Sequence, residues 1–218
     1  MAHLKRQKVP KIWPLHRKGN TFVVRPKGSI EKGIPLLVGL RDMLVVAKTK
    51  KEVKKAISEG NILINKRKAR DVREALTLFD NVSLVPVKKS YKLVILESGR
   101  FGFEEIKDAE AGKKIAKVID KKILKGKKIQ INLEDGRNYL LDSKEKYNIG
   151  DSAVIDVEKK KIEEYLPMDK GSKVLVFEGK HTGKTGEIKA IEKDRKMVMV
   201  KIAEKEVEVL IKQVIVIK

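Results

Sequence analysis

Positive charge is concentrated towards the start of this chain, and that distribution limits what the chain can fold into more than any other feature. Residues 1–35 contain nine basic residues and one acidic residue, a net charge of +8. Residues 36–90 contain thirteen basic and six acidic residues, a net charge of +7, while the whole chain carries +21. Because like charges repel one another in a compact monomer, this excess indicates a polyanionic partner such as nucleic acid.

The composition predicts small aliphatic cores and excludes several classes of protein. Of the 218 residues, 41% are hydrophobic but only 5% are aromatic, which favours several small domains over one large core. The absence of cysteine excludes disulfides, thiol catalysis and cysteine-ligated zinc, and it fits a reducing compartment. Since neither a signal peptide nor a long apolar stretch is visible, we expect a cytoplasmic protein with no membrane partner.

Proline gathers in the same basic region. Four of the six prolines lie within residues 1–35, and each one fixes φ and removes a backbone donor. We expect a basic extended N-terminal arm here, mobile in the free protein and ordered on a polyanion, with Trp13 and Phe22 packing or stacking. The residues of this arm predicted to contact the polyanion are Lys5, Arg6, Lys8, Lys11, Arg17 and Lys18.

Residues 36–90 have the pattern of a small helix–helix–strand module. Apolar residues at helical spacing predict a first helix up to about Ala47. Thr49 and Glu52 fit a capping box that starts a second helix, and Gly60 lies where that helix needs a left-handed residue at its end. A strand, a turn and a returning strand are predicted at residues 62–64, 65–66 and 82–85.

The polar positions of this module are unusually basic. An isolated lysine on an exposed helix face is more often a solvated side chain than a ligand contact. Here the basic residues cluster with few acids among them, which favours contact with phosphate groups. The residues predicted to make these phosphate contacts are Arg41, Lys50, Lys51, Lys54, Lys55, Lys66, Arg67, Lys68 and Arg70.

Residues 91–167 favour a β-rich central domain. Alternating apolar residues predict a strand at 129–133, and Asp135-Gly136 is a typical hairpin turn after it. Residues 115–123 fit a strand or a helix equally well. Further strands are predicted at 93–96, 139–141 and 153–157.

The last part of the chain, residues 168–218, is typical of a small β domain. Five short apolar segments separated by tight turns predict an SH3-like barrel, although five strands also fit an open sheet. The strands are expected at 174–177, 187–191, 197–202, 207–211 and 214–217.

Residues 179–185 approach the pattern of a phosphate-binding loop but lack its spacing. They read Gly-x-x-x-Gly-Lys-Thr, one residue short between the glycines, and Glu178 stands where the first glycine belongs. The alternating residues after Gly186 continue as a strand, whereas a phosphate-binding loop leads into a helix. We therefore expect no nucleotide cofactor.

The same stretch resembles a KOW motif, a turn-rich pair of strands known from ribosomal proteins and transcription factors. The likeness starts at Lys173, and Gly186 occupies the hallmark glycine position. A glycine there permits a positive φ or a close approach of two backbones. Lys180 and Lys184 are then predicted RNA contacts. The predicted structural glycines of the chain are Gly60, Gly183 and Gly186.

The helix–helix–strand segment resembles the RNA-binding module named after protein four of the bacterial small ribosomal subunit. The likeness covers Leu40–Ala47, Val53–Ile57 and Glu59–Asn65. Members often have Asp-Gly where this chain has Asn65-Lys66. Such modules also occur in pseudouridine synthases and a tRNA synthetase, so the resemblance implies RNA binding in general.

The order of the parts is similar to that of the archaeal and eukaryotic family of small-subunit ribosomal proteins, S4e, and the short stretch between Lys18 and Pro35 suggests an archaeal type. The resemblance implies a structural role, with ribosomal RNA and neighbouring ribosomal proteins as partners, in an α+β chain of four parts: 1–35, 36–90, 91–167 and 168–218. The matching residues include His3–Arg6, Pro10–Trp13, Arg25-Pro26, Ile34–Leu37, Leu40–Asp42 and Asp169–Gly171.

Catalysis finds no support in the sequence. The histidines His3, His16 and His181 have no carboxylate at a recognisable spacing, and no metal-ligand spacing is present. We expect a non-enzymatic constituent of the small subunit without a cofactor or a metal. The alternative is an RNA-modifying or regulatory factor built from the same modules, which needs a positioned Asp or a cofactor loop that residues 91–166 lack.

We predict that the protein neither binds nor hydrolyses ATP or GTP at residues 179–185, because the glycine spacing is short and a strand replaces the helix. Isothermal titration with ATP measures this directly. Micromolar binding that disappears in Lys184→Ala would contradict the prediction.

Overall fold

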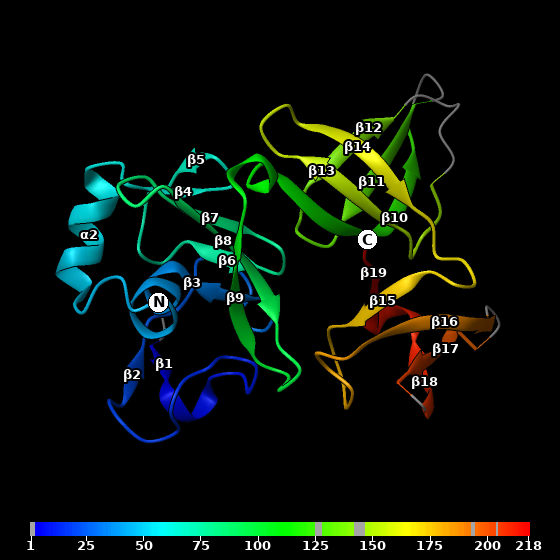
Figure 1. Cartoon of the computed structure of the whole chain (residues 1–218), viewed down its shortest axis with the longest axis horizontal. Coiled ribbons are helices and arrows are strands. Elements are labelled where there is room, and N and C mark those ends of the chain that lie inside the picture. The colour runs from blue at the N-terminus through cyan, green and yellow to red at the C-terminus, as the bar shows by residue number, and fades with distance from the viewer. Residues whose placement is uncertain (1–2, 125–127, 142–146, 193–194, 204) are drawn as a thin grey trace. The chain divides into compact units, whose positions relative to one another are not determined.

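The computed structural model describes residues 3–124, 128–141, 147–192, 195–203 and 205–218. The chain forms two compact units, Met1–Leu96 with Arg100–Lys113 and Glu97–Gly99 with Lys114–Lys218. Most described elements are strands in several sheets, and the few helices are short (Figure 1). Of the expected α+β fold, the coarse content is confirmed: the described residues are mostly β-strand in several sheets with a few short helices.

The first unit is built on a five-stranded antiparallel sheet of order β5-β4-β7-β8-β9. The module continues beyond residue 90, since Val82 in β7 pairs with Tyr91 in β8, and β9 pairs with β8 in turn. The structure thus places residues 91–96 and 100–113 with the helices and not with the central β-structure. The strands are β4 (Ile62–Ile64), β5 (Arg67–Lys68), β7 (Asn81–Leu84), β8 (Lys89–Ile95) and β9 (Phe101–Ile106).

The N-terminal residues fold back on this unit, so the expectation of an extended arm is wrong for residues 3–35. Trp13 is only 2% exposed, and the carbonyl of Ile12 accepts a 2.8 Å hydrogen bond from the amide of Phe101. Burial of such apolar side chains outweighs the charge repulsion that favours an extended chain. The elements here are β1 (Leu4–Lys5), which pairs with β2 (Phe22–Val23), η1 (Arg6–Lys8), and β3 (Gly33–Pro35), which pairs with β6 (Ala75–Thr77).

Two helical segments follow β3. The first comprises α1 (Leu36–Val38) and a wide π-helical turn, η2 (Gly39–Met43), and it ends before the predicted Ala47 because Val45 has a φ of +53°. A left-handed residue cannot continue a right-handed helix. The second helix is α2 (Lys50–Ser58), with Thr49 as its N-cap, as the sequence predicts.

The central sheet of the second unit has the order β12-β11-β10-β13-β14. Residues 115–123, which fit either a helix or a strand, belong to a strand. The predicted turn at Asp135-Gly136 is confirmed, with Gly136 at a φ of +85°. The strands are β10 (Lys113–Ile123), β11 (Ile129–Leu133), β12 (Asn138–Leu141), β13 (Ser152–Asp156) and β14 (Lys161–Leu166), and a 3₁₀ turn, η3 (Asp108–Glu110), precedes β10.

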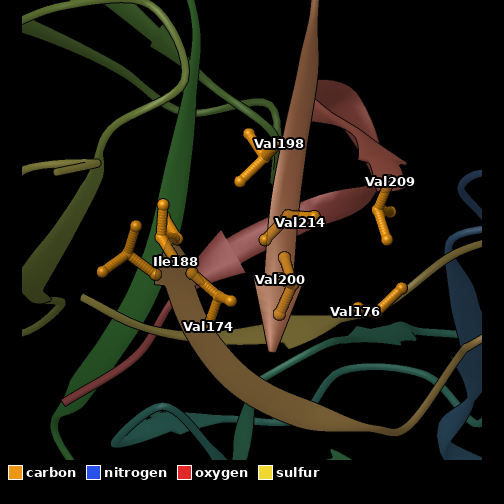
Figure 2. Packing of buried hydrophobic residues seen from close by; sticks show 8 residues of the cluster. Val174, Val176, Ile188, Val198, Val200, Val209 and Val214 are labelled. Carbon is orange, nitrogen blue, oxygen red and sulfur yellow. The ribbon is translucent and has the colours of Figure 1, made fainter. Parts of the chain in front are cut away.

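The last sheet has the order β18-β17-β16-β15-β19. All five expected strands are present, and alternate residues such as Val174, Ile188 and Val200 turn inward into one aliphatic core (Figure 2). Each side chain buried there contributes about 1.5–3 kcal/mol before the cost of ordering it. The elements are β15 (Lys173–Val176), β16 (Thr185–Glu192), β17 (Met197–Ile202), β18 (Lys205–Leu210), η4 (Ile211–Gln213) and β19 (Val214–Val216).

A buried lysine joins the two sheets of the second unit. Lys117 on β10 is 4% exposed, and its Nζ donates hydrogen bonds to the carbonyl oxygens of Ile211 and Val214. A second link runs from the amide of Val216 to Oγ of Ser152, 3.0 Å away. A buried ammonium group is tolerated only with such acceptors, so Lys117 has a structural role.

Gly186 lies where β16 crosses close to β17. Its φ is outside the left-handed region, so of the two reasons for a glycine only the close approach holds. A Cβ atom at this position would overlap the carbonyl oxygen of Lys201 and lie 2.7 Å from Cγ1 of Val200.

We predict that Gly186→Ala destabilises the second unit by about 1–3 kcal/mol, because the added methyl group has no room between two paired backbones. Thermal unfolding followed by circular dichroism should show a lower midpoint. Gly112→Ala is the matched control, since its nearest neighbour, Cγ of Lys66, would be 4.0 Å from the new Cβ. Equal midpoints for the two variants would contradict this account.

Candidate nucleic-acid interface

Helix α2 presents four lysines on its outward face. Val53 is buried on the opposite side, against the body of the first unit. The four lysines stand at positions i, i+1, i+4 and i+5, which lie on one side of a helix, and all are exposed. We call this set the lysine face: Lys50, Lys51, Lys54 and Lys55.

The one acid in the first turn of α2 is held at the cap and away from the lysine face. The carboxylate of Glu52 accepts hydrogen bonds from the Lys48 amide and the Thr49 hydroxyl, both at 2.8 Å. The Thr49 hydroxyl accepts in turn from the Glu52 amide at 3.3 Å. The bond from the Lys48 amide, followed by that from Thr49, keeps the pKa of Glu52 below its ordinary value. The helix therefore starts at a defined residue with its lysines directed outward.

Gly60 ends the helix at a φ of +75°. The amides of Gly60 and Asn61 donate to the carbonyls of Ile57 and Ala56 at 3.0 and 2.9 Å, the pattern of a Schellman motif. A Cβ atom on Gly60 would lie 3.5 Å from Cε of Lys68, so Lys68 adjoins the end of the helix. Lys68 is exposed and extends the basic surface from α2 to β5.

The hairpin between β4 and β5 turns at Asn65-Lys66, and both residues have a positive φ. This is the geometry of a type I′ turn, which asparagine enters more readily than most residues. Buried Asn65 is held from both sides: its Nδ2 donates to Asp80 at 2.7 Å, and its Oδ1 accepts from the Asn81 amide at 2.9 Å. This chain has Asn65-Lys66 where similar RNA-binding modules often have Asp-Gly, and the two residues still form a tight two-residue hairpin.

Four of the predicted RNA-binding residues are paired with carboxylates within the chain, and the longest of these ion pairs joins Lys55 of the lysine face to Glu59 at 3.9 Å. Arg41 donates to both oxygens of Asp42, at 3.0 and 2.8 Å, and these bonds raise the pKa of Arg41. Lys66 contacts Asp108 at 2.7 Å and lowers the pKa of that carboxyl group. Arg67 forms an ion pair with Glu74. The charges of Arg41, Lys66 and Arg67 are thus largely cancelled. The sequence alone did not reveal this for Lys66, because its partner Asp108 lies far away along the chain.

The six predicted RNA-binding residues of the N-terminal region divide into two kinds. Arg6 donates from Nε to the Asn20 carbonyl and from Nη1 to the His16 carbonyl, both at 2.8 Å, and so closes the N-terminal loop. The others are exposed and form no ion pair among the described residues. They are Lys5, Lys8, Lys11, Arg17 and Lys18.

The remaining predicted contacts are exposed. Arg70 follows β5, and no ion pair of its side chain occurs in the part of the chain that the structure describes. Lys180 and Lys184 lie in the loop between β15 and β16, in the second unit. In that loop Gly183 has a φ of +88° and donates to the Val176 carbonyl at 2.7 Å. Strand β16 follows directly, where a nucleotide-binding loop has a helix.

Among the described residues we also looked for a membrane-spanning helix and for a cluster of metal ligands. No helix among them is long and apolar enough to cross a membrane. Nor do three or more His, Asp or Glu side chains gather among them in a way that would hold a metal ion.

Comparison with known proteins identifies the family. The model of the RS4NT (NUC023) domain matches residues 2–28, and that of ribosomal family S4e matches residues 87–162. Small ribosomal subunit protein eS4 of Methanocella arvoryzae is 38% identical over 192 residues, which cover 87% of this chain and 80% of that protein.

The chain belongs to ribosomal family S4e.

Other S4e proteins agree. The eS4 protein of Methanothermobacter thermautotrophicus is 36% identical over 87% of this chain and 78% of its own length. The crystal structure of the 30S ribosomal protein S4e from Thermoplasma acidophilum superimposes with a TM-score of 0.74 at 25% identity, covering 86% of this chain and 95% of that one. The resemblance inferred from the sequence is confirmed, and a family of ribosomal proteins agrees with the expected lack of enzymatic activity.

We predict that Lys50→Glu combined with Lys51→Glu weakens binding to small-subunit RNA at least about tenfold at about 0.1 M salt and lowers the salt slope by about two. Acidic residues are favourable at a helix N-terminus, so these changes do not unfold α2. The matched control is Lys88→Glu with Lys107→Glu, which makes the same charge change at exposed lysines of the first unit. Equal losses in the two double variants would mean that only net charge matters.

Proposed function

We propose that this S4e-family chain is a structural constituent of the small ribosomal subunit in the cytoplasm, where it binds ribosomal RNA and neighbouring ribosomal proteins and supports subunit assembly. The observation that carries the proposal is the lysine face of α2. Four exposed lysines stand on a helix whose two ends are fixed by hydrogen bonds, and the acid among them is turned to the cap. The relatives named above are themselves small-subunit proteins.

The chemistry of the interface is neutralisation of phosphate charge. Each lysine that contacts a phosphate releases counterions from the RNA, which supplies affinity without base specificity. Because α2 is held against the first unit by buried Val53, the lysines are presented on a rigid surface and lose less conformational entropy on binding than a loose tail. Lys68 and Arg70 extend the contact beyond the helix.

We also propose a division of labour within the chain. The N-terminal residues and the module through Lys113 act as the main RNA-binding part, which agrees with the compact first unit. The β-rich middle and a KOW-type SH3-like barrel over residues 168–218 supply shape and further contacts through Lys180 and Lys184. Support for the barrel comes from the five consecutive strands, the single aliphatic core and the close approach at Gly186.

The protein is expected to remain with small ribosomal subunits when they sediment through a gradient at high salt, because a constituent that is assembled into the particle has many simultaneous contacts. A modifying or regulatory factor, held by fewer contacts, dissociates under these conditions. Mass spectrometry of the gradient fractions gives the readout. Complete loss of the protein from washed subunits would contradict the proposal.

A further inference from the structure

Strands β10, β11 and β12 are neighbours in the central sheet of the second unit (Figure 1). One face of these strands combines lysines with exposed aliphatic side chains. Residues that oppose each other across antiparallel strands share a face, and the register pairs Lys122 with Gln130 and Gln130 with Leu140. Leu124 donates from its amide to the Lys128 carbonyl at 2.8 Å, which continues the face by one step. We call this set the hairpin face: Lys122, Leu124, Lys128, Gln130 and Leu140.

The two sides of these strands differ in burial around Ile131 and Leu141, although Ile123, on the inner side at the end of β10, is 80% exposed. On the inner side Ile131 is fully buried and Leu141 is nearly so, as parts of the core of the central sheet. On the hairpin face Leu140 is 63% exposed and Leu124 is 39% exposed, and both lysines are exposed. Aliphatic side chains beside lysines on one face of a sheet fit a partner that has both charge and apolar surface.

The charge around this face indicates that the partner is negatively charged. The sequence from residue 121 to residue 133 contains five lysines and no acidic residue. One acid, Asp120, lies on the same face opposite Asn132, and its carboxylate accepts a hydrogen bond from the amide of Lys121 at 2.8 Å. Lys122 and Lys128 form no ion pair among the described residues, and residues 125–127, which lie outside them, are not part of the proposed site. A polyanion is complementary to this surface.

We propose that the hairpin face is a second RNA-binding site and that it takes an A-form RNA duplex, an inference that rests on the ribosomal function proposed above. Lys122 and Lys128 contact phosphates, while Leu124 and Leu140 pack against the riboses of the wide, shallow minor groove, the side of an RNA duplex that protein surfaces reach. Recognition of single strands relies on aromatic side chains that stack on bases. The one aromatic residue between 119 and 141 is Tyr139, which packs against the core.

The first arm of the test uses the full chain with a 20-base-pair RNA duplex and a single strand of the same length, at one salt concentration (about 0.1 M). Lys122→Glu with Lys128→Glu should weaken duplex binding at least about tenfold, with a smaller loss on the single strand. The matched control is Lys160→Glu with Lys161→Glu, an identical charge change in the same unit but beside Glu158, Glu163 and Glu164. Equal losses in the two double variants, or equal losses on both RNAs, would overturn the proposal.

The second arm tests the aliphatic contact. Leu140→Ser should weaken duplex binding about three- to tenfold, because it removes apolar surface that binding buries. Ile149→Ser is the control, since Ile149 is 62% exposed in the same unit and lies outside the hairpin face. An unchanged affinity for Leu140→Ser would overturn this part of the inference. Unfolding midpoints equal to that of the unaltered chain show that each loss comes from the interface.

The lysine-face variant, Lys50→Glu with Lys51→Glu, separates failure of this inference from failure of the proposed function. If it loses affinity while the Lys122/Lys128 variant does not, the hairpin face binds no RNA and the proposed function stands. If the unaltered chain does not bind small-subunit RNA at all, the proposed function itself is wrong. If the Lys122/Lys128 variant keeps its duplex affinity but fails to enter small subunits, the partner of this face is a protein, and the RNA site is rejected.

Discussion

Three polar residues, Asn65, Asp80 and Asn81, hold the first unit in its arrangement. Asn65 contacts both of the others, and Asp80 also accepts from the amide and the hydroxyl of Thr77 at 2.6 and 2.7 Å. Nδ2 of Asn81 donates to the carbonyls of Ala111 and Lys113, at 3.0 and 2.8 Å, where the chain leaves the unit. All three residues are buried, where a hydrogen bond between polar groups is stronger than in water, so these bonds tie the three positions together. The turn before β5, the start of β7 and the end of the unit are thus interdependent.

That network matters for function because it fixes the surroundings of α2. The basic surface runs from the helix to Lys68 on β5, and β5 follows the turn that Asn65 stabilises. Two other basic groups of this unit, Lys66 and Arg67, are paired with carboxylates and contribute little net field. What remains is a limited set of exposed lysines on a rigid scaffold, of which Lys55 lies 3.9 Å from the carboxylate of Glu59. A binding surface of this kind depends less on the total charge of +21 than on which charges the fold leaves without a partner.

In the second unit, too, the fold determines which lysines are buried and which remain exposed. Lys117, a residue type that is almost never fully buried without acceptors, lies between the two sheets because carbonyl groups around η4 bind its ammonium group. The alternation of a β-strand sends Ile131 and Leu141 into the core and leaves Lys122, Gln130 and Leu140 outside. One strand pattern therefore supplies both the packing of the unit and its candidate RNA contact.

The sequence by itself determined most local structure. The capping box at Thr49 and Glu52, the turns at Asn65 and Gly136, and the strands of the C-terminal sheet follow from side-chain chemistry within a few residues, which is why their patterns are legible. It also predicted the family, because the order of its motifs is distinctive. The lysine face of α2 could also be predicted from the sequence, since helical spacing alone assigns these lysines to one side of the helix.

The tertiary structure decided what depends on residues far apart in sequence. The N-terminal residues fold back because Trp13 has a core to enter and Ile12 has a strand to pair with, and neither is visible from a run of prolines and lysines. The first unit extends to Lys113 because β8 and β9 complete its sheet by backbone hydrogen bonds. Such bonds form between residues of almost any type, so the sequence does not show which strands pair. The pairing of Lys66 with Asp108 and the crowding at Gly186 arise in the same way. Local patterns specify elements, whereas charge cancellation and close packing are properties of pairs that only folding brings together.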